Sequence, residues 1–294
     1  MAGQLIECVP NFSEGHDATV VRAIEDAIGS APGVLMLRAE LDADHNRSVI
    51  TFAGPPDAVR EGALRGIAKA VERIDLRKHT GVHPRIGAAD VVPFVPLEGA
   101  TLADCVKIAH QTGATVWERL GVPVYFYEAA ATSPERERLE NCRRGGFESP
   151  NLPPDLGGPK LHPTAGACVI GARNLLIAFN INLASPDVGI ARAMARKIRA
   201  SSGGFPFVKA MGVNLASRGL AQVSMNLTNF ERTGLDQVYS AVRAEADRVG
   251  VPIAGIEIVG LVPKKAIDMA AASDPWWKNF DPSLILENRL TKIS

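Results

Sequence analysis

The sequence predicts an α+β protein built from two ferredoxin-like (βαββαβ) subdomains, each a sheet with helices on one face. In the first hundred residues, short β-rich apolar runs and amphipathic helical runs follow the order β-α-β-β-α-β, and the same order begins again near residue 174. Between the two series lies a stretch rich in proline and glycine, residues 147–167. We therefore expect two domains, 1–179 and 180–294, whose remaining sheet faces or edges enclose a cleft.

The elements of the first half follow from apolar spacing and from turn residues. Val20, Val21, Ile24 and Ile28 form one apolar stripe at helical spacing, and a glycine ends that segment. The prolines of the run 90–97 place this strand at an irregular or edge position. The expected strands are 4–10, 34–41, 48–54 and 90–97, and the expected helices are 18–30 and 56–74.

The remaining elements extend the first series and build the second. After the first series we expect a helix at about 102–120, a strand at 122–127 and a charged helix at 133–146. The irregular stretch that follows is longer than a simple connection, and such loops in compact domains are usually functional or disordered. In the second half the expected strands are 174–183, 207–215, 220–230 and 251–260, and the expected helices are 187–204 and 234–250.

Composition excludes several classes of protein. The 32 basic and 32 acidic side chains cancel, so the chain lacks the electrostatic footprint of a nucleic-acid-binding protein. The four cysteines lie far apart without metal-ligand spacing, as expected of reduced thiols. The first residues lack the basic and apolar regions of a signal peptide, and no apolar run reaches the ~18 residues of a membrane helix. We therefore expect a cytoplasmic globular protein.

The stretch 78–90, KHTGVHPRIGAAD, concentrates ionisable side chains in a loop that glycine and proline constrain. His79 and His83 have the i, i+4 spacing of a zinc site on a helix, but the glycine between them and Pro84 argue against a helix. Two interpretations remain. The stretch is a solvated basic turn, or it holds one imidazole rigidly at the mouth of the next strand, where histidine suits proton transfer near neutral pH.

Three other stretches are polar enough to form a site. Asn11, in CVPNFSEG (8–15), follows the first strand, where open αβ folds often bind ligands, although an ordinary helix cap explains the same residues. The stretch 40–48, ELDADHNRS, clusters acids with a histidine, an asparagine and an arginine, as a β-turn also would. The stretch 157–166, GGPKLHPTAG, has no phosphate-loop spacing and is either a linker or a backbone wall for a flat ligand.

These segments resemble the formimidoyltransferase domain family, which occurs in glutamate formimidoyltransferase and in formimidoyltransferase-cyclodeaminase. CVPNFSEG and HPRIGA are the specific segments of the resemblance, and the others support it. The matching segments run in family order over nearly the whole chain: 5–15, 46–56, 79–97, 122–130, 131–148, 164–183, 220–227 and 260–266.

The resemblance implies transfer of a formimino group from N-formimino-L-glutamate to N5 of tetrahydrofolate, with release of L-glutamate, in histidine degradation and one-carbon metabolism. It implies two αβ subdomains that form a folate-binding cleft, with tetrahydrofolate as a co-substrate, and we expect no metal. It also implies that His83 is the catalytic general acid/base. The implied folate-binding residues are Gly157, Gly158, Pro159, Lys160, Leu161, His162, Pro163, Thr164, Ala165, Gly166 and Gly204.

A mechanism follows for the residues around His83. The formimino carbon is electrophilic as an amidinium, and a carboxylate of Glu40, Asp42 or Asp44 would hold that cation. His83 would take a proton from N5 and deliver one to the departing glutamate nitrogen. Arginine can grip the carboxylates of both substrates in bidentate fashion. The expected supporting residues are Asn11, Glu40, Asp42, Arg47, His79 and Arg85.

Three alternatives stay open. A related folate-dependent formyltransferase would take its group from N-formyl-L-glutamate. A metal-dependent hydrolase would use His79, His83, Asp42 and Asp44 as ligands. A non-catalytic protein would bind folate without turnover. Because the doubled αβ pattern leaves sheet edges exposed, we expect a homodimer, with small-molecule substrates and no nucleic-acid or membrane partner.

Overall fold

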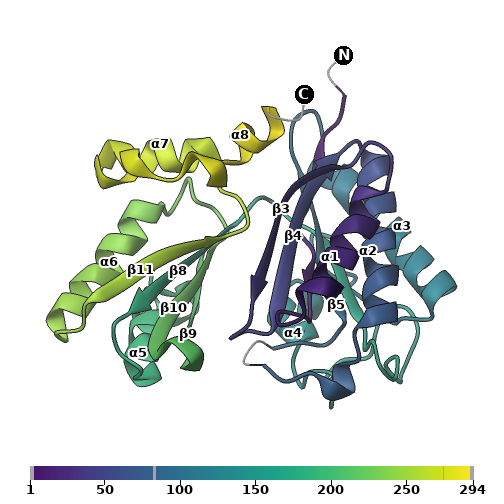
Figure 1. Ribbon diagram of the computed structural model, residues 1–294, viewed down its shortest axis with the longest axis horizontal. Helices are drawn as coiled ribbons and strands as arrows, with labels where there is room; N and C mark the ends of the chain where they lie inside the picture. The colour runs from purple at the N-terminus through teal and green to yellow at the C-terminus, as the bar shows by residue number, and fades with distance from the viewer. Residues whose placement is uncertain (1–2, 82–83, 274, 292–294) are drawn as a thin grey trace. The chain divides into compact units, whose positions relative to one another are not determined.

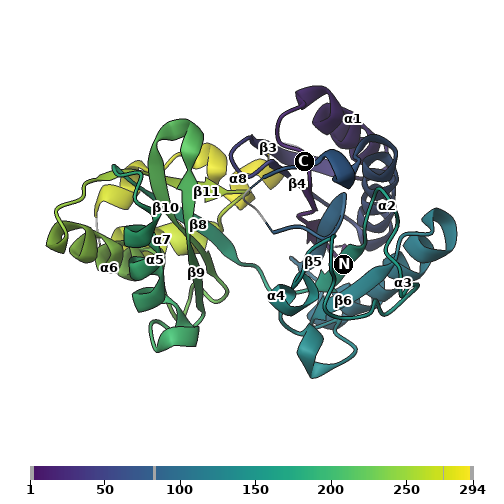
Figure 2. The ribbon, with the colours of Figure 1, turned by 90° about the horizontal axis from the view of Figure 1, so that it is seen from below.

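The computed structural model describes residues 3–81, 84–273 and 275–291. The chain forms two compact units, residues 1–174 and 175–294, each with its own sheet and its own hydrophobic core (Figure 1, Figure 2). The units divide just before β8 (Ile177–Leu183), whereas the expected boundary after residue 179 falls inside this strand. The predicted α+β class with two sheets is confirmed.

The sheet of the first unit is mixed. Its strands, in spatial order, are β3 (Leu35–Asp42), β4 (Arg47–Gly54), β1 (Ile6–Cys8) with β2 (Asn11–Phe12), β5 (Ala89–Pro96), β7 (Cys168–Ala172) and β6 (Val124–Glu128). β1 and β2 each pair antiparallel with both β4 and β5, so they are two halves of one interrupted strand. β7 joins β5 in parallel, and β6 joins β7 in parallel.

This unit contains the predicted β-α-β-β-α-β order and one addition. α1 (Ala18–Gly29) follows the first strand, and α2 (Pro56–Arg73) precedes β5. The addition is the parallel pair β6 and β7, which the chain reaches through α3 (Leu102–Leu120). The sequence pattern does not predict β7, because this strand, CVIGA, has only five residues and most of its side chains are small.

α1, α2 and α3 pack on one face of the first sheet, over a shared apolar core (Figure 1). Asp17 caps α1 by accepting hydrogen bonds from the next backbone N–H groups, and Thr101 with Asp104 forms a capping box at the start of α3. The core includes three side chains of the predicted apolar stripe, Val21, Ile24 and Ile28.

The opposite face of this sheet is partly covered as well. The segment after β6, with the one-turn helix α4 (Leu139–Cys142), packs over β5, β7 and β6. The predicted helix 133–146 is therefore wrong, because apart from α4 only the 3₁₀ turn Pro134–Arg136 is helical, and Gly145 and Gly146 take positive φ. Toward β3 and β4 the same face carries polar side chains instead.

The prolines of the run 90–97 predict an irregular or edge position, and β5 is central in the sheet. Pro93 lies opposite Val9, where β1 and β2 are interrupted, so its missing N–H falls at a gap in the ladder. The Val9 carbonyl accepts a hydrogen bond from Asn11 Nδ2 instead, at 3.1 Å. The predicted irregularity is therefore present, and the Asn11 side chain supplies the hydrogen bond that Pro93 cannot donate.

The second unit contains a four-stranded antiparallel sheet in the order β11 (Ile253–Val259), β8, β10 (Leu220–Leu227) and β9 (Val208–Leu215). The chain runs β8-α5-β9-β10-α6-β11, with α5 (Val188–Ile198) and α6 (Leu235–Arg248), so the predicted element order is confirmed. α5 and α6 lie on one face of the sheet, and α7 (Lys264–Ser273) and α8 (Leu286–Thr291) follow (Figure 1).

Alternation along these strands separates an apolar face from a polar one. Phe179 and Ile181 of β8 and Val223 of β10 are buried in the core beneath the helices. Asn182, which follows Ile181, and Gln222, which precedes Val223, stand directly opposite each other and point to the other face. The second sheet therefore has one apolar face and one polar face.

Several features that would point to other classes of protein are absent from the described residues. No helix there is long and apolar enough to cross a membrane. No group of three or more His, Cys, Asp or Glu side chains there is placed to hold a metal ion. All four cysteines are free and buried, and burial raises the pKa of the Cys105 thiol to about 12. They are inert thiols at neutral pH.

Candidate active site

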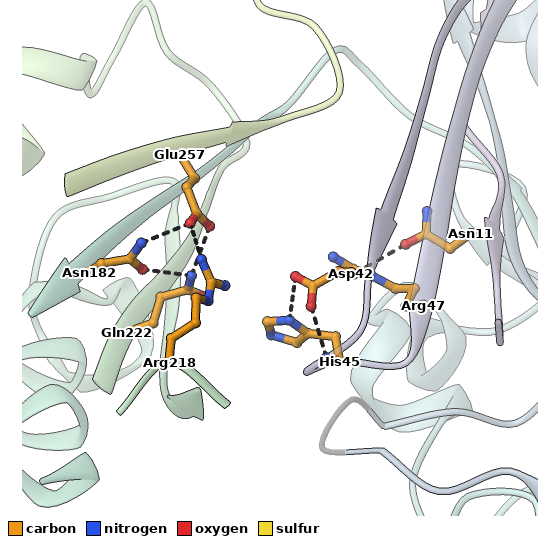
Figure 3. Close-up of polar contacts among 8 residues, drawn as sticks. All are labelled: Asn11, Asp42, His45, Arg47, Asn182, Arg218, Gln222 and Glu257. Atoms are coloured by element: carbon orange, nitrogen blue, oxygen red, sulfur yellow. Dashed lines mark hydrogen bonds and ion pairs between the residues drawn. The ribbon is translucent and has the colours of Figure 1, made fainter. Parts of the chain in front are cut away.

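The turn between β3 and β4 is fixed by Asp42, the last residue of β3 (Figure 3). Asp42 Oδ1 accepts a hydrogen bond from the His45 backbone N–H at 2.9 Å, and Oδ2 lies 2.7 Å from His45 Nδ1. Burial alone would raise the pKa of Asp42, but the hydrogen bonds from the His45 side chain and backbone and the charge of Arg47 lower it to about 2. Asp42 is therefore ionised at neutral pH.

Arg47 and Asn11 lie beside this turn on the polar face of the first sheet (Figure 3). Arg47 Nη1 donates a hydrogen bond to Asn11 Oδ1 at 3.2 Å. Burial, and next the charge of Arg143, lower the pKa of Arg47 to about 10, against the opposite effect of nearby acids. Arg47 still carries its charge at neutral pH, and the structure brings Asn11, Asp42 and Arg47 together.

The acids considered for holding an amidinium occupy different positions. Asp42 stands directly opposite Arg47 across the β3–β4 ladder. Glu40 is two residues earlier on the same face and forms an ion pair with Arg38 on its own strand, at 2.7 Å. Asp44 lies in the turn that follows β3. Of the three acids, Asp42 is therefore the one that is paired directly across the ladder with Arg47.

Asn46, in the same turn, joins three segments that are far apart in the sequence. Its Oδ1 accepts a hydrogen bond from Gly15 N at 2.9 Å, and its Nδ2 donates one to Thr80 O at 2.7 Å. Its backbone carbonyl lies 2.9 Å from His79 Nε2. Asn46 has φ +46°, a left-handed conformation that asparagine tolerates better than most residues. A turn asparagine was visible in the sequence, but its distant partners were not.

These contacts hold the start of the histidine loop, which we define as residues 79–88. Burial lowers the pKa of His79, whose Nδ1 is buried without a hydrogen-bond partner among the described residues. Arg85 Nη2 donates to the His79 carbonyl at 3.2 Å and to Glu148 Oε1 at 2.8 Å. His83, the predicted general acid/base, lies outside the described residues.

A buried ion pair that no sequence pattern indicates holds the other end of the histidine loop. Asp90 is 2% exposed, accepts hydrogen bonds from Ile86 N at 2.7 Å and Gly87 N at 3.2 Å, and pairs with Arg143. Ser13 Oγ also donates to Gly87 O at 2.7 Å. In the sequence, the only signal for this pair is Asp90 itself, an acid at the start of an apolar strand. A charge buried there needs a partner of opposite charge.

The second half of the predicted folate-binding loop lies alongside the histidine loop. Ala88 N donates to Ala165 O at 2.9 Å, and Ala167 N donates to Ile86 O at 3.0 Å. Gly166 has φ +68°, and a Cβ there would lie 2.0 Å from Ile86 O, so the close approach of the two segments requires glycine.

The first half of the same loop lies elsewhere. Gly157 packs against the indole ring of Trp117 on α3, where a Cβ would lie 2.6 Å from a ring carbon. Residues 158–160 are exposed, while His162 is tied back to Gly166 by two backbone hydrogen bonds of 2.9 Å. In the second unit, Gly204 packs against the carbonyls that end α5, so a structural reason for this glycine exists without any ligand.

Comparison with known proteins agrees with this division of the chain. Residues 5–173 match the formiminotransferase domain, N-terminal subdomain, and residues 178–293 match the formiminotransferase domain. The chain is 42% identical over 295 residues to a glutamate formimidoyltransferase of Streptococcus pyogenes serotype M1, with 98% of this chain and 99% of the relative covered. It is 44% identical over 299 residues to the glutamate formimidoyltransferase of Thermoplasma acidophilum, with 99% and 98% covered.

A longer relative matches over part of its length. The formimidoyltransferase-cyclodeaminase of Rattus norvegicus is 44% identical over 284 residues, which are 92% of this chain and 52% of that protein. Both halves of the chain therefore match the two parts of one domain, and two relatives match from end to end. The chain belongs to the formiminotransferase family.

Proposed function

We propose that this chain is a glutamate formimidoyltransferase. It transfers the formimino group from N-formimino-L-glutamate to N5 of tetrahydrofolate and gives 5-formimidoyltetrahydrofolate and L-glutamate. The observation that carries this proposal is identity of 42–44% over nearly the full length of two glutamate formimidoyltransferases. The reaction belongs to histidine degradation and one-carbon metabolism, and tetrahydrofolate is a co-substrate of this family.

We assign the proton transfers to His83. N5 of tetrahydrofolate attacks the formimino carbon and forms a tetrahedral intermediate, His83 accepts the N5 proton, and the glutamate nitrogen takes a proton as its bond to carbon breaks. The position of the histidine loop supports this role, because Asn46 holds it at Thr80 and Asp90 holds it at Ile86. A fixed backbone on both sides favours a positioned catalytic group over a mobile surface turn.

We assign the amidinium cation to Asp42 in preference to Glu40. Asp42 is ionised at neutral pH and carries lone pairs beyond the two contacts with His45. Glu40 is already engaged by Arg38 on its own strand. A carboxylate beside the formimino carbon stabilises the positive charge that makes this carbon electrophilic.

Arg47 is the preferred cation for a substrate carboxylate. It lies beside Asp42 and Asn11, and its guanidinium keeps its charge at neutral pH. Arg85 is directed to Glu148 and to the His79 carbonyl, which supports a role in holding the histidine loop.

The remaining assignments stay predictions. We propose that residues 157–166 and Gly204 contact the folate, and the second half of the loop is the better supported, because it lies against the histidine loop. The ferredoxin-like form of both sheets, the folate-binding cleft, the domain limits 1–179 and 180–294, the cytoplasmic location and the homodimer are likewise proposals drawn from the sequence and the family. No metal is assigned a role.

The test is tetrahydrofolate-dependent release of L-glutamate from N-formimino-L-glutamate by the native protein and by His83→Ala. We expect turnover in the native protein and a loss of about 10²–10⁴-fold in the variant, with tetrahydrofolate still bound. Near-full activity of His83→Ala would remove the proton-transfer role. Activity only with N-formyl-L-glutamate would replace the proposed donor by the formyl donor, and product analysis with both donors decides between them.

A further inference from the structure

The polar face of the second sheet carries a cluster of four linked side chains, to which the mechanism above assigns no role (Figure 3). Asn182 on β8 and Gln222 on β10 stand opposite each other, and Glu257 lies on β11. Glu257 Oε1 accepts hydrogen bonds from Asn182 Nδ2 at 2.8 Å and from Arg218 Nη1 at 2.6 Å. Gln222 Nε2 donates to Asn182 Oδ1 at 2.9 Å and to Glu257 Oε2 at 3.2 Å.

This cluster differs from the usual solvated face of an antiparallel sheet. Asn182 is 6% exposed and Gln222 is 0% exposed, although both point away from the apolar core. Burying amide groups is unfavourable unless every donor and acceptor finds a partner. The buried amides therefore call for a reason beyond strand stability.

One acceptor in the cluster lacks a partner. Gln222 Oε1 is buried and has no hydrogen-bond partner among the described residues. Exchanging the oxygen and nitrogen of this amide does not help, because the oxygen would then face Asn182 Oδ1 and Glu257 Oε2, which are both acceptors. The orientation is therefore fixed by its neighbours, and the cluster offers a buried acceptor that a ligand N–H can fill.

The chemistry of the cluster selects the kind of ligand. Gln222 Oε1 and the Glu257 carboxylate are both acceptors, which suits a planar group that presents adjacent N–H donors. In the proposed reaction two groups have this character, the 2-amino and N3–H edge of the pterin and the amidinium of the formimino donor. The Arg218 guanidinium already balances the charge of Glu257, so a neutral edge is favoured over a second cation.

We infer that Gln222 and Glu257 form a subsite that reads the N–H edge of the pterin of tetrahydrofolate. This inference rests on the proposed function and deepens it, because it names residues of the second unit that recognise the acceptor substrate. It requires no proton transfer or bond change at the cluster. The subsite acts in binding only.

Gln222→Met tests the inference, because it keeps the length of the side chain and removes both hydrogen-bonding atoms. We expect the Kd and the KM for tetrahydrofolate to rise about tenfold, the effect of one buried hydrogen bond, while the KM for N-formimino-L-glutamate changes less than about twofold. Ser224→Ala is the matched control, because Ser224 lies on the same face of β10 outside the cluster, and its constants should match the native protein.

Each other result has a defined meaning. If only the donor KM rises, the subsite reads the amidinium and the pterin assignment is overturned. Unchanged constants in a folded Gln222→Met variant make the cluster structural and overturn the inference. If Gln222→Met does not fold, Glu257→Gln carries the same test. The Kd for tetrahydrofolate is measured without turnover, so an inactive native protein overturns the proposed function while this inference is still decided by the Kd.

Discussion

Replacing Asn46 perturbs the contacts that join the β3–β4 turn to Gly15 and to the histidine loop. Asn46→Ala removes two hydrogen bonds of 2.9 and 2.7 Å and leaves Gly15 N and Thr80 O without these partners. Each bond contributes about 1 kcal/mol to the free energy of unfolding. Alanine at φ +46° costs about another 1 kcal/mol, because its Cβ crowds the backbone in the left-handed region. The expected loss is about 3 kcal/mol.

Asn46→Gly separates the two contributions. Glycine loses the same hydrogen bonds but accepts a positive φ, so its expected loss is about 2 kcal/mol. Urea denaturation followed by circular dichroism measures both variants, and Asn151→Ala, an exposed asparagine of the same unit, should stay within about 0.5 kcal/mol of the native protein. Equal losses in the alanine and glycine variants would refute the φ argument. Losses below about 0.5 kcal/mol in both would show that Asn46 does not hold these segments.

The same substitution has a kinetic consequence. If Asn46 positions the histidine loop, Asn46→Gly should lower kcat about tenfold, because small misplacements of a catalytic group are costly, while the KM for tetrahydrofolate changes less. Steady-state kinetics at a temperature well below the unfolding transition measures both constants. An unchanged kcat in a destabilised variant would mean that Asn46 supports the fold and not the position of His83.

Two further outcomes follow from single positions. The pKa of Asp42 is about 2 in the folded protein and about 3.9 in an unfolded chain, so this carboxylate stabilises the fold above about pH 4 and the stabilisation is lost as the pH falls toward 2. It amounts to about 2–3 kcal/mol. The free energy of unfolding of Asp42→Asn should therefore depend less on pH between 2 and 5, and an unchanged dependence would contradict this. Gly166→Ala should lose more than about 2 kcal/mol, because its Cβ would lie 2.0 Å from Ile86 O, whereas Gly203→Ala, at φ +85° with open space around it, should lose about 1 kcal/mol. Equal losses at the two glycines, measured by thermal unfolding, would refute the steric argument.

Local pattern predicted the elements well where one periodicity was unbroken. The stripe of α1 and the alternation of β8 and β10 are set by neighbours in the sequence, so they are legible there. The helix 133–146 is predicted because its charged residues have high helix propensity. The prediction is wrong because two glycines with positive φ and the burial of Cys142 decide the conformation. Tertiary packing overrode propensity in that segment.

The site was only partly predictable for a related reason. Asp42 and Arg47 come together because a hairpin brings near neighbours into register. Asp90 with Arg143, and Asn46 with Thr80, join segments that no local pattern connects. Each of these pairs became visible only when the fold placed a buried polar group and its partner side by side.

Asn11 shows how structure and site depend on each other in this family member. Pro93 lacks the N–H that would close the ladder, and Asn11 Nδ2 supplies a donor to the Val9 carbonyl in its place. The other end of the same amide, Oδ1, accepts from Arg47. Because both ends of the amide are engaged, Asn11 orients Arg47, the cation that we propose contacts a substrate carboxylate. In an unbroken ladder the backbone N–H of the neighbouring strand would have bonded the Val9 carbonyl. The break at Pro93 leaves this bond to the Asn11 side chain, which fixes the direction of its amide toward Arg47.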